Sequence, residues 1–131
     1  MVPAIDGIID TTILIHLFRG NKDAAAWIAT QRTLGVTTIS RMEFIYGARG
    51  RSALAMVMHL LNTFTTIALT DADQLWAERQ LIAFRLSHGV EINDTLIASV
   101  THRLQLPIYT QNVKDMQKVL PANLVIRPFI A

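Results

Sequence analysis

Short apolar runs alternate with longer segments of helical spacing along this chain. Five of the runs are rich in aliphatic or β-branched residues and have the length of buried strands. Polar residues or turn formers bound them, as Asp10 bounds the run Gly7-Ile8-Ile9. Strands are therefore predicted at residues 7–9, 36–39, 65–69, 107–110 and 124–126.

The segments between these runs carry apolar residues three and four positions apart, which predicts helices. Glycine tolerates the left-handed conformation that often closes a helix, and Gly20, Gly35 and Gly89 are assigned this role. Gly50 is expected to separate two helices. Helices are predicted at residues 13–18, 22–34, 40–49, 52–61, 71–88, 94–104 and 113–120.

This alternation of strands and helices predicts an α/β fold with a mainly parallel central sheet covered on both faces. The 131 residues, 51% of them hydrophobic, fit a single domain spanning residues 1–131. No apolar run approaches the roughly 18–20 residues of a membrane span. The segment from Met1 to Asp6 lacks the basic start of a signal peptide, so a cytoplasmic protein is expected.

Composition narrows the chemistry. The chain has no cysteine, which excludes disulfides and thiolate metal sites. A net charge of +2 is too small to identify a nucleic-acid-binding protein by itself. Neither a glycine-rich phosphate loop nor a histidine pair with zinc-protease spacing is present. The four histidines are scattered, at His16, His59, His88 and His102.

Acidic residues stand near the ends of the predicted strands. Asp10 ends the first strand, and Glu43 falls in the first turn of the helix after the second. Asp94 begins a helix, while Asn112 and Asp115 follow the fourth strand. Ligand sites of parallel sheets lie at the carboxyl ends of the strands, so these residues are expected to converge. Grouped carboxylates suit Mg²⁺ or Mn²⁺, which can activate water and neutralise charge on a phosphate.

Each acid also has a structural interpretation. Asp10 could cap the first helix, and Glu43 could close an S-x-x-E capping box with Ser40. Asp94 could be favoured by the helix dipole. A similar box at residues 70–73 is assigned no function. On pattern alone, a nuclease and a purely structural role for these acids both stay open.

Four segments resemble, in order, the motifs of PIN-domain ribonucleases, in particular the VapC-type toxins of VapBC toxin–antitoxin pairs. The first joins an apolar strand to Asp-Thr-Thr and an apolar helix, and the second carries a single glutamate and a trailing glycine. The third reads Asn-Asp-Thr-Leu-Ile-Ala-Ser, and the fourth contains Thr-Gln-Asn-Val-Lys-Asp. The resemblance covers essentially the whole chain. The segments are residues 8–15, 39–47, 93–99 and 109–116.

The resemblance implies a PIN-like three-layer α/β/α domain and an endoribonuclease that depends on Mg²⁺ or Mn²⁺. Water activated by the metal would hydrolyse RNA and leave a 5′-phosphate, and the toxin would inhibit translation. It also implies a homodimer and a cognate VapB-type antitoxin that covers the site. By motif match, Asp10, Glu43 and Asp94 are the expected catalytic and metal-binding residues. Supporting roles are expected for Thr11, Ser40, Thr110, Asn112 and Asp115.

Two positions depart from the family pattern. Thr12 stands where many members have asparagine, so a hydrogen-bonding group is kept but the amide is lost. Asn112 stands where many PIN domains have a fourth aspartate, although Asp115 is near enough to compensate. We expect one firmly held metal, with a second only when an RNA phosphate supplies ligands.

Arg19, Arg49 and Arg51 follow helices close to the motif-bearing strands and are the candidates for RNA phosphate contacts. Each could equally be a solvated cation at a helix end. Single-stranded loops are the accessible targets for sequence-selective cleavage.

Two other functions compete with the toxin ribonuclease. A catalytically weak PIN-like module that binds RNA or protein is compatible with Asn112 in the fourth acidic position. A phosphatase would use Asp10 as a nucleophile, but the second acid expected two residues later is absent.

Overall fold

The computed structural model describes residues 4–31 and 33–130, which contain a five-stranded sheet with only parallel neighbours. The strand order is β3-β2-β1-β4-β5. The chain therefore builds one side of the central strand first, and then crosses over to build the other. The strands are β1 (Gly7–Ile9), β2 (Leu34–Thr37), β3 (Thr65–Ile67), β4 (Ile108–Tyr109) and β5 (Val125–Ile126).

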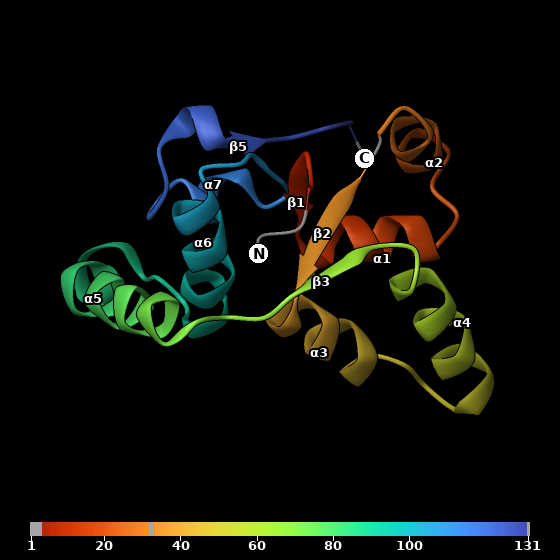
Figure 1. The fold of residues 1–131 in the computed structure, drawn as a ribbon, viewed down its shortest axis with the longest axis horizontal. Coiled ribbons are helices and arrows are strands. Elements are labelled where there is room, and N and C mark those ends of the chain that lie inside the picture. Colours follow the sequence, from red (N-terminus) through yellow and green to blue (C-terminus); the bar gives the residue numbers. More distant parts are fainter. Residues whose placement is uncertain (1–3, 32, 131) are drawn as a thin grey trace.

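Helices cover both faces of the sheet. They are α1 (Thr11–Phe18), α2 (Lys22–Ala29), α3 (Thr38–Tyr46), α4 (Arg51–Leu61), α5 (Asp71–His88), α6 (Ile92–Leu104) and α7 (Val113–Met116), with a 3₁₀ turn η1 (Ala122–Leu124). Figure 1 shows α1, α2 and α4 on one side of β1, and α5, α6 and α7 on the other. The predicted three-layer α/β/α fold is confirmed.

Neighbouring residues of β1 enter two different cores. Ile8 packs in a cluster with Ile97 of α6 and Met116 of α7. Ile9 packs in the opposite cluster, with Leu14 of α1 among others. Both β1 isoleucines are fully buried. Side chains alternate along a strand, so an unbroken apolar run is the expected sequence of a strand covered on both faces.

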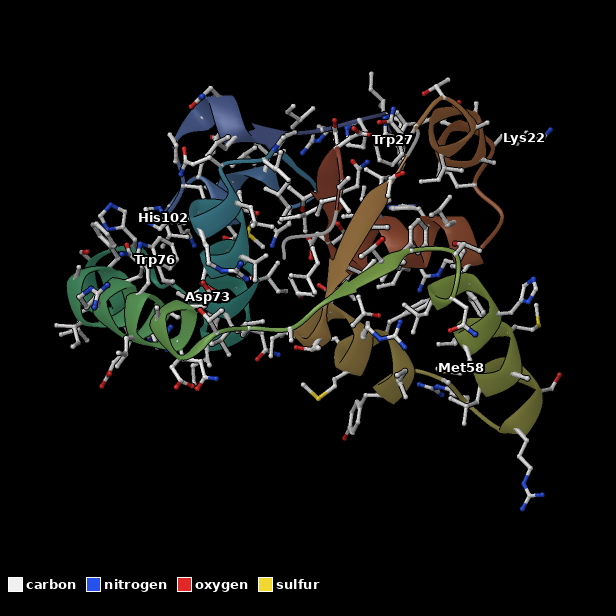
Figure 2. All side chains as sticks on the ribbon, viewed as in Figure 1. Lys22, Trp27, Met58, Asp73, Trp76 and His102 are labelled. Carbon is white, nitrogen blue, oxygen red and sulfur yellow. The ribbon has the colours of Figure 1, made fainter. Side chains whose placement is uncertain are left out.

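Polar and aromatic contacts fix α5 to α6 (Figure 2). Arg103 Nε donates to both carboxylate oxygens of the buried Asp73, at 2.9 and 3.0 Å. Trp76 stacks on His102 with ring centroids 4.7 Å apart. Thr70 and Asp73 also form the predicted capping box at the start of α5. Asp73 is thus an acid with a structural role.

The second predicted helix is too long. Helix α2 ends at Ala29, and Leu34 and Gly35 belong to β2, so Gly35 closes no helix. A Cβ atom at Gly35 would lie 2.3 Å from Cδ1 of Ile67, which explains why the strand carries a glycine at this point. An apolar run by itself does not separate a buried strand from a helix end.

Helix α3 begins earlier than predicted. Thr38 and Ile39, predicted as strand, are its first residues. The N-cap is Thr37, whose hydroxyl accepts a hydrogen bond from Ser40 N at 3.1 Å. The predicted capping box between Ser40 and Glu43 is therefore wrong, because a threonine three residues upstream already caps the helix. Glu43 lies in the second turn, not the first.

The other predicted elements have the predicted type, and their ends shift by a few residues. The largest shift is at α7, which ends at Met116. The turn that follows is of the 3₁₀ type, because Lys118 N donates to the oxygen of Asp115, three residues earlier. Within the described part of the chain, no helix is long and apolar enough to cross a membrane. Residues 1–3 of the N-terminal segment and Arg32 of the predicted helix 22–34 lie outside the described residues.

Candidate active site

The ends of β1 and β4 carry Asp10 and Thr110. These two strands are parallel neighbours. The strand order reverses between them, because β2 and β3 lie on one side of β1 and β4 and β5 on the other. Crevices at such switch points are where open α/β sheets bind ligands. Thr110 Oγ1 donates to Asp10 Oδ2 at 2.6 Å, so the two strand ends are joined across the switch point.

Asp10 is buried but well supplied with donors. Only 4% of its surface is exposed. Thr11 N donates to its Oδ1 at 2.6 Å, and Thr12 Oγ1 donates to its Oδ2 at 3.2 Å. Burial raises its pKa, against the lowering effect of the hydrogen bonds from Thr110, Thr11 and Thr12. Asp10 is also the N-cap of α1, so the structural interpretation is correct and coexists with a place in the site.

Glu43 reaches the same edge of the sheet from α3. Its Oε1 accepts a hydrogen bond from Thr11 Oγ1 at 2.6 Å, and its Oε2 accepts one from Asn93 Nδ2 at 3.0 Å. Thr11 thus contacts two carboxylates, Asp10 through its backbone and Glu43 through its hydroxyl. The supporting role predicted for Thr11 has a geometric basis in these two bonds.

Asp94 lies in the first turn of α6 and is partly buried. Its pKa is raised to about 6, first by burial and then by the negative charges of Asp10, Asp115, Glu43 and Glu91. Carboxylates from β1, α3, α6 and α7 are thus near enough to oppose each other's ionisation. The charge effects agree with the expected convergence of the acids, which stays a prediction.

The described residues contain no group of three or more acidic or histidine side chains already positioned around one point as metal ligands. The two oxygens of Glu43 accept hydrogen bonds from Thr11 and Asn93. Both oxygens of Asp10 likewise accept hydrogen bonds, from Thr11, Thr12 and Thr110, while the charge of Asp10 raises the pKa of Asp94.

Asn112 and Asp115 contribute differently. Asn112 N donates to Thr110 Oγ1 at 2.9 Å, so its backbone fixes the hydroxyl that holds Asp10. Asp115 pairs with Lys118 Nζ at 2.8 Å, and this hydrogen bond lowers its pKa. Asp115 therefore already has its own cation, whereas the described residues provide no ion pair for Asp94.

Sequence reasoning missed two residues of this network. Thr12, noted only as a departure from the family pattern, accepts a hydrogen bond from Gln111 N at 3.0 Å while its hydroxyl contacts Asp10. Asn93 orients Glu43. The available signal was position, because each is a polar residue within two places of a predicted ligand. Ser40 Oγ is buried and has no hydrogen-bond partner among the described residues.

Two of the three candidate arginines share a cavity with Glu43. Arg19 and Arg49 line a cavity of about 400 Å³ between α1, α3 and α4, together with Thr11 and Glu43. Arg51 is not among its lining residues and instead begins α4. The structure thus brings Arg19 and Arg49 to the site and places Arg51 outside this cavity.

Residues 8–119 match the sequence profile of the PIN domain family. The chain belongs to this family. The match spans both strand ends and all the acidic positions described above, so the predicted family is confirmed. No curated protein sequence matches this PIN domain.

Solved structures resemble this PIN domain over almost its full length. A toxin–antitoxin complex from Klebsiella pneumoniae is 26% identical, with a TM-score of 0.72 and coverage of 94% of this chain and 98% of that one. A DNA-bound VapBC complex from Salmonella typhimurium has a TM-score of 0.77 at 18% identity, covering 93% and 97%. VapC20 of Mycobacterium tuberculosis, a toxin that cleaves the sarcin–ricin loop, has a TM-score of 0.68 at 13% identity, covering 86% and 95%.

Proposed function

We propose that this PIN domain is a metal-dependent endoribonuclease, the VapC-type toxin of a type II toxin–antitoxin pair, and that its cleavage of RNA inhibits translation. The observation that carries the proposal is the hydrogen-bonded arrangement at the switch point, where Thr110 holds Asp10 and Thr11 contacts both Asp10 and Glu43. The raised pKa of Asp94 agrees with nearby negative charge. The family match and the toxin–antitoxin relatives support the same activity.

The residues present fit a hard divalent cation. The donors at the strand ends are all oxygens, and the mutual repulsion of the acids is the kind that a bound cation relieves. Asp10 and Asp94 would hold Mg²⁺ or Mn²⁺, with Glu43 completing the set. Such an ion lowers the pKa of water and neutralises charge developing on a phosphate.

The chain's own residues prepare this site. Thr110, Thr12 and the backbone of Thr11 fix the orientation of Asp10. Thr11 and Asn93 hold Glu43 from opposite oxygens. Locked side chains of this kind are needed because small displacements of reacting groups cost large factors in rate.

Arg19 and Arg49 would bind backbone phosphates of the RNA, because they share a cavity with Glu43. The guanidinium group matches phosphate oxygens in shape and charge. RNA bound there would approach the acids from the side of α1 and α3.

Two protein partners belong to the proposal. The Klebsiella pneumoniae relative is a toxin–antitoxin complex, which supports a cognate VapB-type antitoxin that covers the site. A homodimer is supported by large apolar side chains exposed on α3 and α5, among them Tyr46 at 92%, Ile82 at 79% and Leu86 at 101%.

Cleavage of structured RNA and total RNA tests this function. The purified protein should cut RNA with Mg²⁺ or Mn²⁺ and not in EDTA, and mapping the cut sites identifies the target. Asp10→Asn and Asp94→Asn should abolish cutting while the fold is kept, and Asp71→Asn on the exposed face of α5 is the matched control. Addition of the protein to a cell-free translation reaction should stop synthesis only when the acids are intact.

Unchanged cleavage by Asp94→Asn would overturn the site assignment. RNA binding without cleavage, equal with and without metal, would instead identify a binding module. That result would agree with the hydrogen bonds that occupy both oxygens of Glu43.

A further inference from the structure

Arg127 leaves the sheet at the same edge as Asp10. It directly follows β5, as Asp10 follows β1 and Thr110 follows β4. These three strands are parallel neighbours in the order β1-β4-β5. Their carboxyl ends therefore open onto one rim, with the basic residue two strands from the buried acid.

A chain of hydrogen bonds connects Arg127 to that acid. Arg127 Nη2 donates to the backbone oxygen of Gln111 at 3.0 Å. Gln111 N donates to Thr12 Oγ1 at 3.0 Å, and Thr12 Oγ1 donates to Asp10 Oδ2 at 3.2 Å. The side chain amide of Gln111 also donates to the Phe129 oxygen at 3.0 Å. The segment after β5 is thus tied to the loop that shapes the site.

A depression of about 370 Å³ lies beside this guanidinium. Its lining residues come from α7 and from the end of β5, namely Val113, Lys114, Gln117 and Arg127. Lys114 and Arg127 are both exposed. The guanidinium of Arg127 and the ammonium of Lys114 therefore line one shallow space, which suits an anion with several oxygens.

Lys114 does not serve the acids of the site as their structural partner. In the described part of the chain, the ion pair of Asp115 is with Lys118, at 2.8 Å. Lys114 acts on Asp115 only through its charge, which lowers the pKa of that carboxyl. Asp115 in turn acts on Asp94. The depression therefore lies near enough to Asp115 for the charge of Lys114 to act on it, and none of its lining residues is an acid.

We propose that Lys114 and Arg127 bind a backbone phosphate of the RNA, on the far side of the acids from Arg19 and Arg49. The proposal rests on the ribonuclease function given above. In Figure 1, α7 lies on one side of β1, while α1 and α4 lie on the other. An RNA strand that is bound by Lys114 and Arg127 on one side and by Arg19 and Arg49 on the other would cross the rim. An intervening phosphodiester would then lie over Asp10.

Basic residues on both sides of the acids also reduce the electrostatic repulsion between the site and RNA. A site built from carboxylates repels an approaching polyanion, and flanking basic groups offset this repulsion. Arg127 is the better positioned of the pair, because a guanidinium fixed by one hydrogen bond still presents a planar fork to phosphate oxygens.

Fluorescence anisotropy of a labelled single-stranded RNA tests the proposal. The Asp94→Asn protein in EDTA is the parent, so neither metal nor cleavage enters the readout. Replacing both Lys114 and Arg127 by glutamine should raise Kd about tenfold at moderate salt. The slope of log Kd against log salt should fall by about 0.7, because each neutralised phosphate of a single strand contributes about 0.7 and the two cations share one phosphate.

Lys22→Gln and Arg79→Gln are the matched controls and should leave the Kd and the slope unchanged. Lys22 lies on α2 and points into solvent in Figure 2, while Arg79 is exposed on α5. Because Arg127→Gln also removes the bond to Gln111, Lys114→Gln is measured alone and should still weaken binding. Arg127→Lys should restore part of the affinity.

An unchanged Kd and slope in the double variant overturn the proposal. Inorganic phosphate provides a second arm: if it binds the parent protein but the double variant holds RNA as tightly as before, the depression takes a free anion and not RNA. If the Asp94→Asn parent binds no RNA, this inference is overturned. If the wild-type chain also cleaves no RNA, the proposed function fails too. If the wild type cleaves RNA but the Kd of the variants is unchanged, only this inference is overturned.

Discussion

Thr110 and Asp10 are separated by 100 residues in sequence, yet Thr110 Oγ1 donates to Asp10 Oδ2 at 2.6 Å. Both side chains are buried, with Asp10 4% exposed and Thr110 not exposed at all. Thr110 Oγ1 also accepts from Asn112 N, which directs its single hydrogen toward the carboxylate. The orientation of a buried acid at the end of β1 thus depends on the residue that ends β4.

Thr110→Val tests this dependence. The variant keeps the shape of the side chain but removes the 2.6 Å hydrogen bond to the buried Asp10 Oδ2 and the acceptor of Asn112 N. We expect the free energy of unfolding to fall by about 1–3 kcal/mol. Urea denaturation measures this loss, and Thr110→Ser, which keeps the hydroxyl, should lose clearly less. Equal losses in the two variants would mean that packing, and not the hydrogen bond, is what Thr110 supplies.

The raised pKa of Asp94 predicts a dependence of stability on pH. In the folded chain this pKa is about 6 against an ordinary value of 3.8. Between these values the folded chain keeps a proton that the unfolded chain has lost, so the contribution of Asp94 to stability falls as the pH rises through this window. Asp94→Asn should therefore stabilise the metal-free protein, by about 1–2 kcal/mol near neutral pH and by little near about pH 4.

Urea denaturation in EDTA, at several pH values, measures the difference between Asp94→Asn and the wild type. The control is Asp71→Asn, an exposed acid of α5. A stability difference that is independent of pH, or that grows as the pH falls, would contradict the prediction.

Divalent metal should act in the opposite direction on the wild type. An ion that binds only the folded chain raises stability by mass action, by about 2.7 kcal/mol at 100 times its Kd. Thermal unfolding should therefore shift to higher temperature with Mn²⁺ in the wild type and in Asp71→Asn. It should stay unchanged in Asp10→Asn and Asp94→Asn. A shift that persists in both of these variants would place the ion elsewhere in the chain.

Gly35→Ala tests the packing between β2 and β3. The added Cβ would lie 2.3 Å from Cδ1 of Ile67 and 2.9 Å from Cδ1 of Ile5. Overpacking of this kind costs about 1–3 kcal/mol, which urea denaturation resolves. Gly47→Ala is the control, because its Cβ would lie 3.6 Å or more from other atoms. A loss no larger than that of the control would show that the two isoleucines move aside freely.

Much of the architecture is determined locally. The runs before Asp10 and Thr110 are apolar and short, and their burial on both faces depends only on the alternation of side chains along a strand. The order of strands and helices then places both residues at strand ends. Sequence therefore predicted the fold class and the position of Asp10 and Thr110 at the ends of neighbouring strands.

The contacts within the site were decided by the tertiary structure. Glu43 takes its partners from Thr11, 32 positions away, and from Asn93, 50 positions away. No periodicity encodes such separations, and the nearer candidate, a capping box with Ser40, was the wrong one. Likewise, the apolar pattern did not predict that α2 ends at Ala29. Leu34 and Gly35 belong to β2, where Gly35 packs closely against Ile67 of β3. Local spacing fixes which residues face a core, whereas hydrogen-bond partners and close backbone approach depend on distances that exist only once the layers have assembled.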